Sequence, residues 1–157
     1  VAQIALDIAK SFCWDWDRCN KVFRAGILHD IGKTVISPDI LNKKEKLSPA
    51  EIGEIRRHTI IGYNILKGVE EYSQYADAVL YHHERPDGKG YPSGIRGDEI
   101  PLFSRIVAVA DAYEAMISKR SYQKSKTNEE AIEELKRCAG TQFDKEVVEV
   151  FIDKVLG

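Results

Sequence analysis

The chain of 157 residues has the size of one ordinary domain, and 23 lysines and arginines against 25 acidic residues give it a formal charge of −2. Its 43% hydrophobic content suffices to bury a core, which excludes a disordered chain. No apolar run approaches the roughly 18 residues of a membrane span. The near-neutral balance argues against a nucleic-acid polymer as partner. Three scattered cysteines, Cys13, Cys19 and Cys138, favour a reducing cytoplasm over a disulfide framework.

The first two helices are predicted from apolar stripes with helical spacing. Residues 1–12 form the first stripe, which starts without a Met or a capping residue. We therefore expect that the sequence begins inside a helix and that the chain is a fragment of a longer protein. The second stripe, over residues 22–27, leads to His29 and Asp30, and Gly32 is expected to end that helix.

The middle of the chain predicts two further helices after a turn-rich stretch over residues 37–46. Ser48-Pro49-Ala50-Glu51 is a capping box with Pro at the first helical position, and it predicts a helix that runs through Leu66. Residues from Glu70 to His83 predict the next helix. Residues 84–99 then concentrate glycine and proline, which predicts a long irregular loop.

Three more helices are predicted after this loop. The first covers Pro101 to Ser118 and carries Asp111 near its middle. The second opens with a capping box at Thr127 and is closed by Gly140, and the last is capped by Asp144. No run alternates with a period of two, so we expect an all-α fold in a single domain over residues 1–157.

Histidines and aspartates near these helices are candidate metal ligands. Neighbouring residues on a helix point about 100° apart, so His82 and His83 suit two nearby ions better than one chelated ion. Imidazole with carboxylate suits Fe, Mn, Ni or Zn. Each site also has a structural alternative. His82 and His83 could end a helix, where the dipole favours cations, and His58 could belong to a solvated basic face. The candidate ligands are His29, Asp30, His58, His82, His83 and Asp111.

Several motifs resemble the HD-GYP branch of the HD phosphohydrolase superfamily over nearly the whole chain. They are His29-Asp30-Ile31-Gly32-Lys33, then His58, then His82-His83-Glu84-Arg85-Pro86-Asp87-Gly88-Lys89-Gly90-Tyr91-Pro92, then Arg105 and Asp111. The resemblance implies the helical bundle of an HD domain. It also implies a bacterial, cytoplasmic signalling protein that hydrolyses cyclic di-GMP to pGpG or GMP at two or three divalent metal ions, with iron or manganese preferred.

The resemblance also implies a role for each candidate residue. Asp30 would bridge two metals, with His29 and Asp111 on one metal and the three remaining histidines, His58, His82 and His83, on the other. Lys33 would contact the scissile phosphate or assist the leaving oxygen. The segment 120–124 resembles the family's R-P-Y-[KR] motif, so Arg120 and Lys124 would bind the second phosphate.

The loop residues Gly90, Tyr91 and Pro92 have a structural interpretation, in which they shape the chain and pack over the core. In the family this loop is also associated with docking of GGDEF domains. The family motif begins with another His, often with a Glu, which would fall before Val1 together with a sensory or receiver domain. We therefore expect the isolated chain to be weakly active.

Two other functions remain open at the level of the sequence. One is a non-catalytic HD-GYP module that binds a cyclic dinucleotide or a GGDEF partner. The other is an HD phosphohydrolase that acts on mononucleotides or alarmones, which would not need the Gly-Tyr-Pro loop. The presence of every expected ligand from His29 onward favours the catalytic reading.

Overall fold

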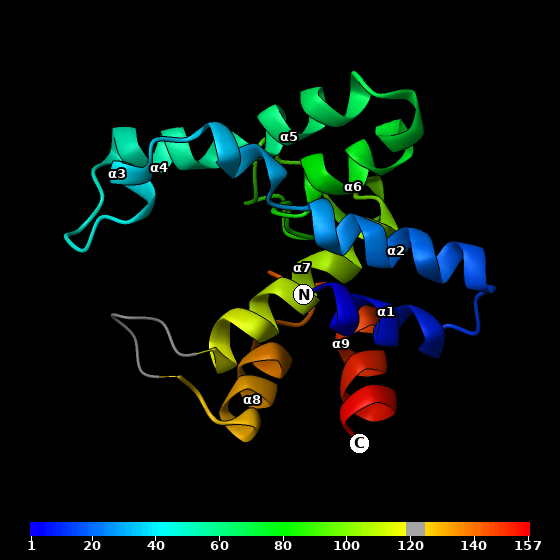
Figure 1. Ribbon diagram of the computed structural model, residues 1–157. Helices are drawn as coiled ribbons and strands as arrows, with labels where there is room; N and C mark the ends of the chain where they lie inside the picture. Colours follow the sequence, from blue (N-terminus) through cyan, green and yellow to red (C-terminus); the bar gives the residue numbers. More distant parts are fainter. Residues whose placement is uncertain (119–124) are drawn as a thin grey trace.

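The computed structural model describes residues 1–118 and 125–157, and the regular elements of these residues are helical (Figure 1). The longer helices are α1 (Ala2–Ser11), α2 (Trp16–Leu28), α4 (Pro49–Arg56), α5 (His58–Lys67), α6 (Ala76–Tyr81), α7 (Leu102–Ile117), α8 (Asn128–Cys138) and α9 (Lys145–Val150). The short elements are 3₁₀ turns η1 (Ile31–Val35), η2 (Glu70–Tyr75) and η3 (Gly97–Glu99), helix α3 (Pro38–Leu41) and π-helical turn η4 (Phe151–Leu156). The predicted all-α class is confirmed, and the predicted irregular loop is confirmed over residues 84–96, whereas residues 97–99 form η3.

Helix α7 occupies the centre of the bundle, with α1 and α2 beside it, α8 packed at its lower end and α9 below α1 (Figure 1). Its buried stripe includes Ile106, Val109, Ala110 and Tyr113, which have the spacing of one helical face. These side chains join buried residues of α1, α2, α8 and α9 in the main hydrophobic core. Asp111 lies next to this stripe, so the core fixes the helix that carries it.

A smaller core beside the first one holds α5 against α6 and contains Leu66 and Val79. Here η1 and α5 approach each other backbone to backbone at Gly32 and Gly62. A Cβ added at Gly32 would collide with the carbonyl oxygen of His58 and lie 2.7 Å from the Gly62 nitrogen. This close approach brings the segment after α2 against the start of α5.

The predicted helix from Ser48 through Leu66 is wrong in one respect, because it is broken at Arg57 into α4 and α5. The His58 ring lies 2.6 Å from the carbonyl oxygen of Ile55, and the Thr59 hydroxyl donates to the carbonyl of Arg56. These side chains occupy carbonyls that would otherwise continue the helical ladder. The break turns His58 inward, where it is 1% exposed.

The predicted helix from Glu70 to His83 is also divided, into the 3₁₀ turn η2 and helix α6, which ends at Tyr81. The Ser73 hydroxyl donates to the Glu70 carbonyl at 2.8 Å, which again competes with α-helical bonding. Helix α2 ends at Leu28 rather than at Gly32. The stretch over residues 37–46, expected to be turns, contains the short helix α3.

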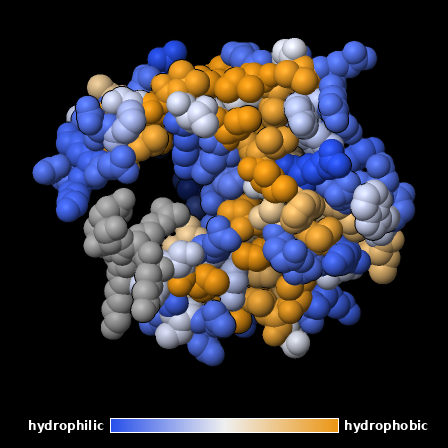
Figure 2. Space-filling view, in the orientation of Figure 1, coloured by the Kyte–Doolittle hydropathy of each residue, from blue (hydrophilic) through white to orange (hydrophobic). Residues whose placement is uncertain are grey.

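The predicted caps are confirmed where the sequence signal is local. Ser48 and Thr127 form capping boxes with Glu51 and Glu130, and Asp144 accepts a hydrogen bond from the Val147 N–H. Space-filling shows apolar residues in a band along the upper edge and a hollow below the end formed by α3 and α4 (Figure 2). Among the described residues, no helix has the length and apolar character needed to cross a membrane.

Candidate metal centre

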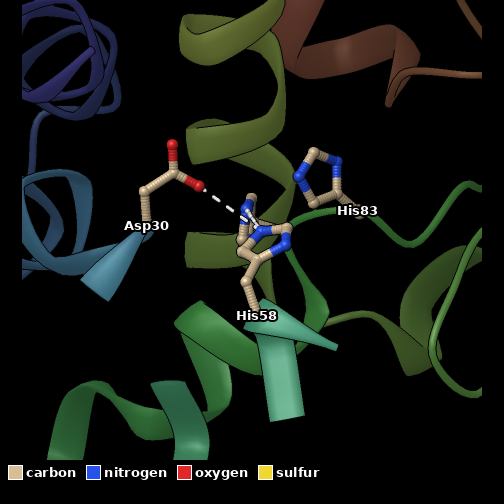
Figure 3. Close-up of side chains that lie close together, drawn as sticks. Asp30, His58 and His83 are labelled. Atoms are coloured by element: carbon tan, nitrogen blue, oxygen red, sulfur yellow. Dashed lines mark hydrogen bonds and ion pairs between the residues drawn. The ribbon is translucent and has the colours of Figure 1, made fainter. Parts of the chain in front are cut away.

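Four parts of the fold converge on one cluster of histidines and aspartates. His29 and Asp30 follow α2, His58 begins α5, His82 and His83 follow α6, and Asp111 lies within α7. One ligand atom from each of Asp30, His58, His82 and His83 lies within 4.8 Å of the others. Figure 3 shows the side chains of Asp30, His58 and His83 directed toward a common space. The structure therefore brings together all six residues predicted as metal ligands.

Backbone carbonyls orient three of the histidines in the same way. Each Nδ1 lies close to the carbonyl oxygen of the residue three positions earlier: His29 to Gly26 (2.7 Å), His58 to Ile55 (2.6 Å) and His82 to Val79 (2.6 Å). A carbonyl oxygen only accepts hydrogen bonds, so Nδ1 carries the proton in each neutral ring. The Nε2 lone pairs are left to face the cluster, as in metal-binding histidines held by outer-shell carbonyls.

Asp30 lies between two groups of ligands. Its Oδ1 is 3.4 Å from His58 Nε2, and its Oδ2 is 3.3 Å from His29 Nε2. On the His29 side, Asp111 Oδ1 lies 3.7 Å from the same His29 nitrogen. On the other side, the Nε2 atoms of His58 and His82 are 3.5 Å apart. This arrangement suits a carboxylate that bridges two ions.

The donor set of the cluster fits divalent metal ions. His29 Nε2 and Asp30 Oδ1 are buried and have no hydrogen-bond partner. Facing the cluster, the carboxylate oxygens and the neutral rings of His58 and His82 offer lone pairs to one another, and a cation would satisfy them together. The set contains nitrogen and oxygen without sulfur, which suits ions such as Fe, Mn or Zn.

The electrostatics of the cluster also favour positive charge at its centre. Burial opposes protonation of His29, but the carboxylates of Asp111 and Asp30 outweigh it and raise the pKa of His29 to about 10. Burial would raise the pKa of Asp30, yet His29 and Lys33 hold that pKa far below its usual range. Burial and the nearby His58 lower the pKa of His83 to about 3. Burial likewise lowers the pKa values of His58 and His82.

Of the residues predicted to contact substrate, the structure places one in the cluster. Lys33, in η1, has its Nζ 2.7 Å from Asp30 Oδ2. The ion pair puts a cationic proton donor at the edge of the centre. Arg120 and Lys124 lie outside the described residues.

A cavity of about 330 Å³ adjoins the centre and contains His83 and Asp111 in its lining. Three cationic side chains also line it: Arg56, Arg85 and Lys89. Arg56 was not predicted as a functional residue, because in sequence it is one of two adjacent arginines, typical of a solvated basic face. Its position two residues before a candidate ligand was the available signal. In the structure, the Arg56 guanidinium lies 4.8 Å from the centre of the Tyr91 ring.

Two of the three predicted loop residues lie at this cavity as well. Gly90 and Tyr91 belong to its lining, and the Tyr91 ring stacks on His83. Glu84, a residue of the same motif for which the sequence predicted no role, is buried, and its Oε1 accepts hydrogen bonds from the backbone N–H groups of Ser93 and Gly94. The structural interpretation of the loop therefore has direct contacts to support it.

Comparisons with known proteins agree with this geometry. The family model described as HD domain matches residues 1–147. A cyclic di-GMP phosphodiesterase of Thermotoga maritima is 44% identical over 130 residues, which cover 82% of this chain and 35% of that protein. A 3'3'-cGAMP-specific phosphodiesterase 2 of Vibrio cholerae is 38% identical over 131 residues, covering 82% of this chain and 25% of that protein.

Among solved structures, an HDG"Y"P protein from Bdellovibrio bacteriovorus superimposes with a TM-score of 0.76 at 17% identity, covering 99% of this chain and 50% of that one. This likeness concerns the fold. The chain spans about a third or less of the length of the two curated relatives described above. The family match, the convergence of six candidate ligands and the helical architecture lead to one conclusion: the chain belongs to the HD domain family.

Proposed function

We propose that this domain is a metal-dependent phosphodiesterase that hydrolyses cyclic di-GMP to pGpG, GMP or both. The observation that carries the proposal is the position of Asp30, whose two carboxylate oxygens face His58 on one side and His29 on the other. A carboxylate between two ligand groups is what a two-metal hydrolytic centre requires. The similarity to named cyclic di-GMP phosphodiesterases supports the choice of substrate.

The six ligand residues would hold the ions in two groups. Asp30 would bridge them, His29 and Asp111 would complete one group, and His58, His82 and His83 would complete the other. When bound, two divalent ions would supply an acidic water and neutralise the phosphate oxygens. We infer that two or three ions bind and that they are iron or manganese.

The chain's other polar residues would bind and orient the substrate. Arg56 and Lys89 line the cavity beside the centre and would attract the phosphates of a cyclic dinucleotide. Lys33 carries its proton at Nζ beside Asp30 and would direct it to the scissile phosphate or to the leaving oxygen. Arg120 and Lys124 would contact the second phosphate.

The biological setting that we propose is bacterial second-messenger signalling in the cytoplasm. The length of the curated relatives supports a sensory or receiver domain elsewhere in the protein as the source of control. A GGDEF domain docked at the Gly90-Tyr91-Pro92 loop would be a second partner. The domain assignment would then be one HD-GYP domain within a larger regulated protein.

The test is hydrolysis of cyclic di-GMP by protein loaded anaerobically with Fe²⁺ or with Mn²⁺, with products separated by chromatography. We expect pGpG or GMP to accumulate, and we expect chelation or Asp30→Ala to stop the reaction. Cyclic GMP-AMP is the comparison substrate, because one curated relative is specific for it. The non-catalytic module would be favoured if metal-loaded protein binds cyclic di-GMP without hydrolysing it. The same must hold for a version of the protein that is extended at its amino terminus.

A further inference from the structure

His83 differs from the other three histidines of the cluster in how its ring is held. His29, His58 and His82 each have Nδ1 within 2.7 Å of a backbone carbonyl oxygen. In residues 1–118 and 125–157, no hydrogen bond is made by a ring nitrogen of His83. Its ring instead stacks on Tyr91, with 4.8 Å between ring centres and 17° between ring planes.

Among the described residues, the other rings in contact with His83 are those of His58 and His82, both in the cluster. The His58 ring meets the His83 ring at 5.2 Å with an interplanar angle of 83°. Tyr91 is therefore the aromatic partner of His83 that is not a candidate ligand. A parallel ring against one face restricts rotation of the imidazole while leaving its nitrogens free to coordinate.

Tyr91 is in turn fixed by the backbone of the segment that carries the histidines. The Tyr91 N–H donates to the His83 carbonyl oxygen at 3.2 Å. A Cβ at Gly90 would lie 2.5 Å from that same oxygen and 2.5 Å from the Arg85 nitrogen, so the loop can fold back this closely only with glycine at position 90. The Arg56 guanidinium lies over the Tyr91 ring, 4.8 Å from its centre.

Glu84 fastens the loop just after Tyr91. Its side chain is buried, with the residue 3% exposed, and Oε1 accepts from the N–H groups of Ser93 at 2.6 Å and Gly94 at 3.1 Å. Charge-assisted hydrogen bonds to backbone N–H groups are among the stronger kinds in proteins. Since Glu84 directly follows His83, one short segment supplies both the candidate ligand and the anchor for the ring that packs on it.

We propose that Tyr91 is a positioning residue for the metal centre, which holds His83 by ring stacking in place of the carbonyl hydrogen bond, and that Glu84 fixes Tyr91 in this position. The proposal rests on the metal centre of the proposed function and is independent of the nucleotide. Outer-shell residues that orient histidine ligands typically contribute about 10- to 100-fold to metal affinity. Tyr91 has this role although it offers His83 a ring face instead of a hydrogen-bond acceptor.

The test is a Mn²⁺ titration followed by electron paramagnetic resonance, without any nucleotide. We expect Tyr91→Ala and Tyr91→Leu to weaken Mn²⁺ binding by about 10- to 100-fold. Tyr91→Phe keeps the ring and should bind as the unaltered protein does. Tyr72→Ala, which removes an exposed tyrosine on η2, is the matched control and should leave Mn²⁺ binding unchanged.

Glu84 is tested in the same titration. Glu84→Ala should weaken Mn²⁺ binding, and Glu84→Gln should retain most of it because the amide oxygen still accepts from the loop. Ser93→Ala keeps the backbone N–H and serves as the control. Urea unfolding of each variant separates a loss of metal affinity from a loss of folding, and if Tyr91→Ala does not fold, the comparison of Tyr91→Leu with Tyr91→Phe decides.

The proposal is wrong if Tyr91→Leu binds Mn²⁺ as tightly as the unaltered protein, or if Tyr91→Phe loses as much affinity as Tyr91→Leu. A protein that binds Mn²⁺ with the expected pattern but does not hydrolyse cyclic di-GMP would support the positioning role and overturn only the choice of substrate. Absence of Mn²⁺ binding in the unaltered protein would overturn both this inference and the metal centre.

Discussion

Oδ1 of Asp30 lies 3.4 Å from Nε2 of His58. The His58 proton is directed to the Ile55 carbonyl on the opposite side of the ring. Two electron-pair donors thus face each other within the protein, and Asp30 Oδ1 is buried without a hydrogen-bond partner. A cation bound between them would remove this conflict.

Asp30→Asn is predicted to disrupt the centre more than the fold. The amide keeps the size of the side chain but removes the charge that would bridge two ions, so Mn²⁺ affinity should fall by about 100-fold or more, beyond the usual outer-shell effect. Turnover of cyclic di-GMP should be lost. Calorimetric titration with Mn²⁺ measures the first effect. Asp77→Asn, an exposed site on α6, is the control, and equal losses in both variants would argue against the bridging role.

The stability of the metal-free protein is predicted to fall as the pH rises above neutral. The pKa of His29 is raised from 6.5 to about 10 in the folded state. Its stabilising contribution is therefore complete below pH 6.5 and is lost as the pH rises toward 10. Urea unfolding in excess chelator should show this loss. His29→Gln should remove the alkaline dependence, and an unchanged dependence in that variant would assign it to another group.

On the acid side, the same metal-free protein is predicted to lose stability through His83. The folded-state pKa of His83 is lowered from 6.5 to about 3, so the unfolded chain binds a proton more readily than the folded chain. The stabilising contribution is present above pH 6.5 and is lost as the pH falls toward 3. Unfolding midpoints measured in chelator should decline over this range. His83→Gln should decline less steeply, and equal slopes would contradict the prediction.

Arg56→Ala is predicted to weaken substrate binding. Its guanidinium lines the cavity beside His83, and losing one charge-assisted contact to a phosphate should raise KM for cyclic di-GMP about ten-fold, or about 1.4 kcal/mol. The effect on kcat should be smaller. Arg57→Ala is a closely matched control, because the adjacent Arg57 is exposed and pairs with Glu54. Steady-state kinetics that show the same KM for both variants would exclude a specific role for Arg56.

Gly32→Ala is predicted to destabilise the fold by about 1–3 kcal/mol, the usual range for overpacking. The added methyl group would collide with the His58 carbonyl oxygen at the contact between η1 and α5. Gly53→Ala in α4 meets no atom within 4 Å and should stabilise the helix by up to about 1 kcal/mol. Urea unfolding of both variants measures the difference. A neutral Gly32→Ala would show that η1 can move away from α5 at little cost.

Features that depend on local sequence were predictable. The capping boxes at Ser48 and Thr127 and the cap at Asp144 were identified correctly, because a cap involves residues only three positions apart. The fold class followed from helical periodicity. The candidate ligands were identified from residue type and position, the resemblance of their motifs implied a role for each, and the structure brings them together.

Features that depend on tertiary contacts were not predictable. The break between α4 and α5 lies at His58, whose ring is buried against Asp30 and His82 from distant parts of the chain, and nothing in the periodicity of that segment indicates this. Arg56 and Arg57 are neighbours of identical type, yet only Arg56 lines the cavity. The role of Glu84 likewise depends on a loop that folds back on its own backbone.

The most direct test of the central claim is anomalous scattering from crystals of the protein grown with Mn²⁺. The account predicts one anomalous peak among Asp30, His58, His82 and His83, and a second peak on the side of Asp30 that faces His29 and Asp111. The account would be contradicted if these side chains are ordered in crystals of folded protein and no anomalous peak lies near Asp30.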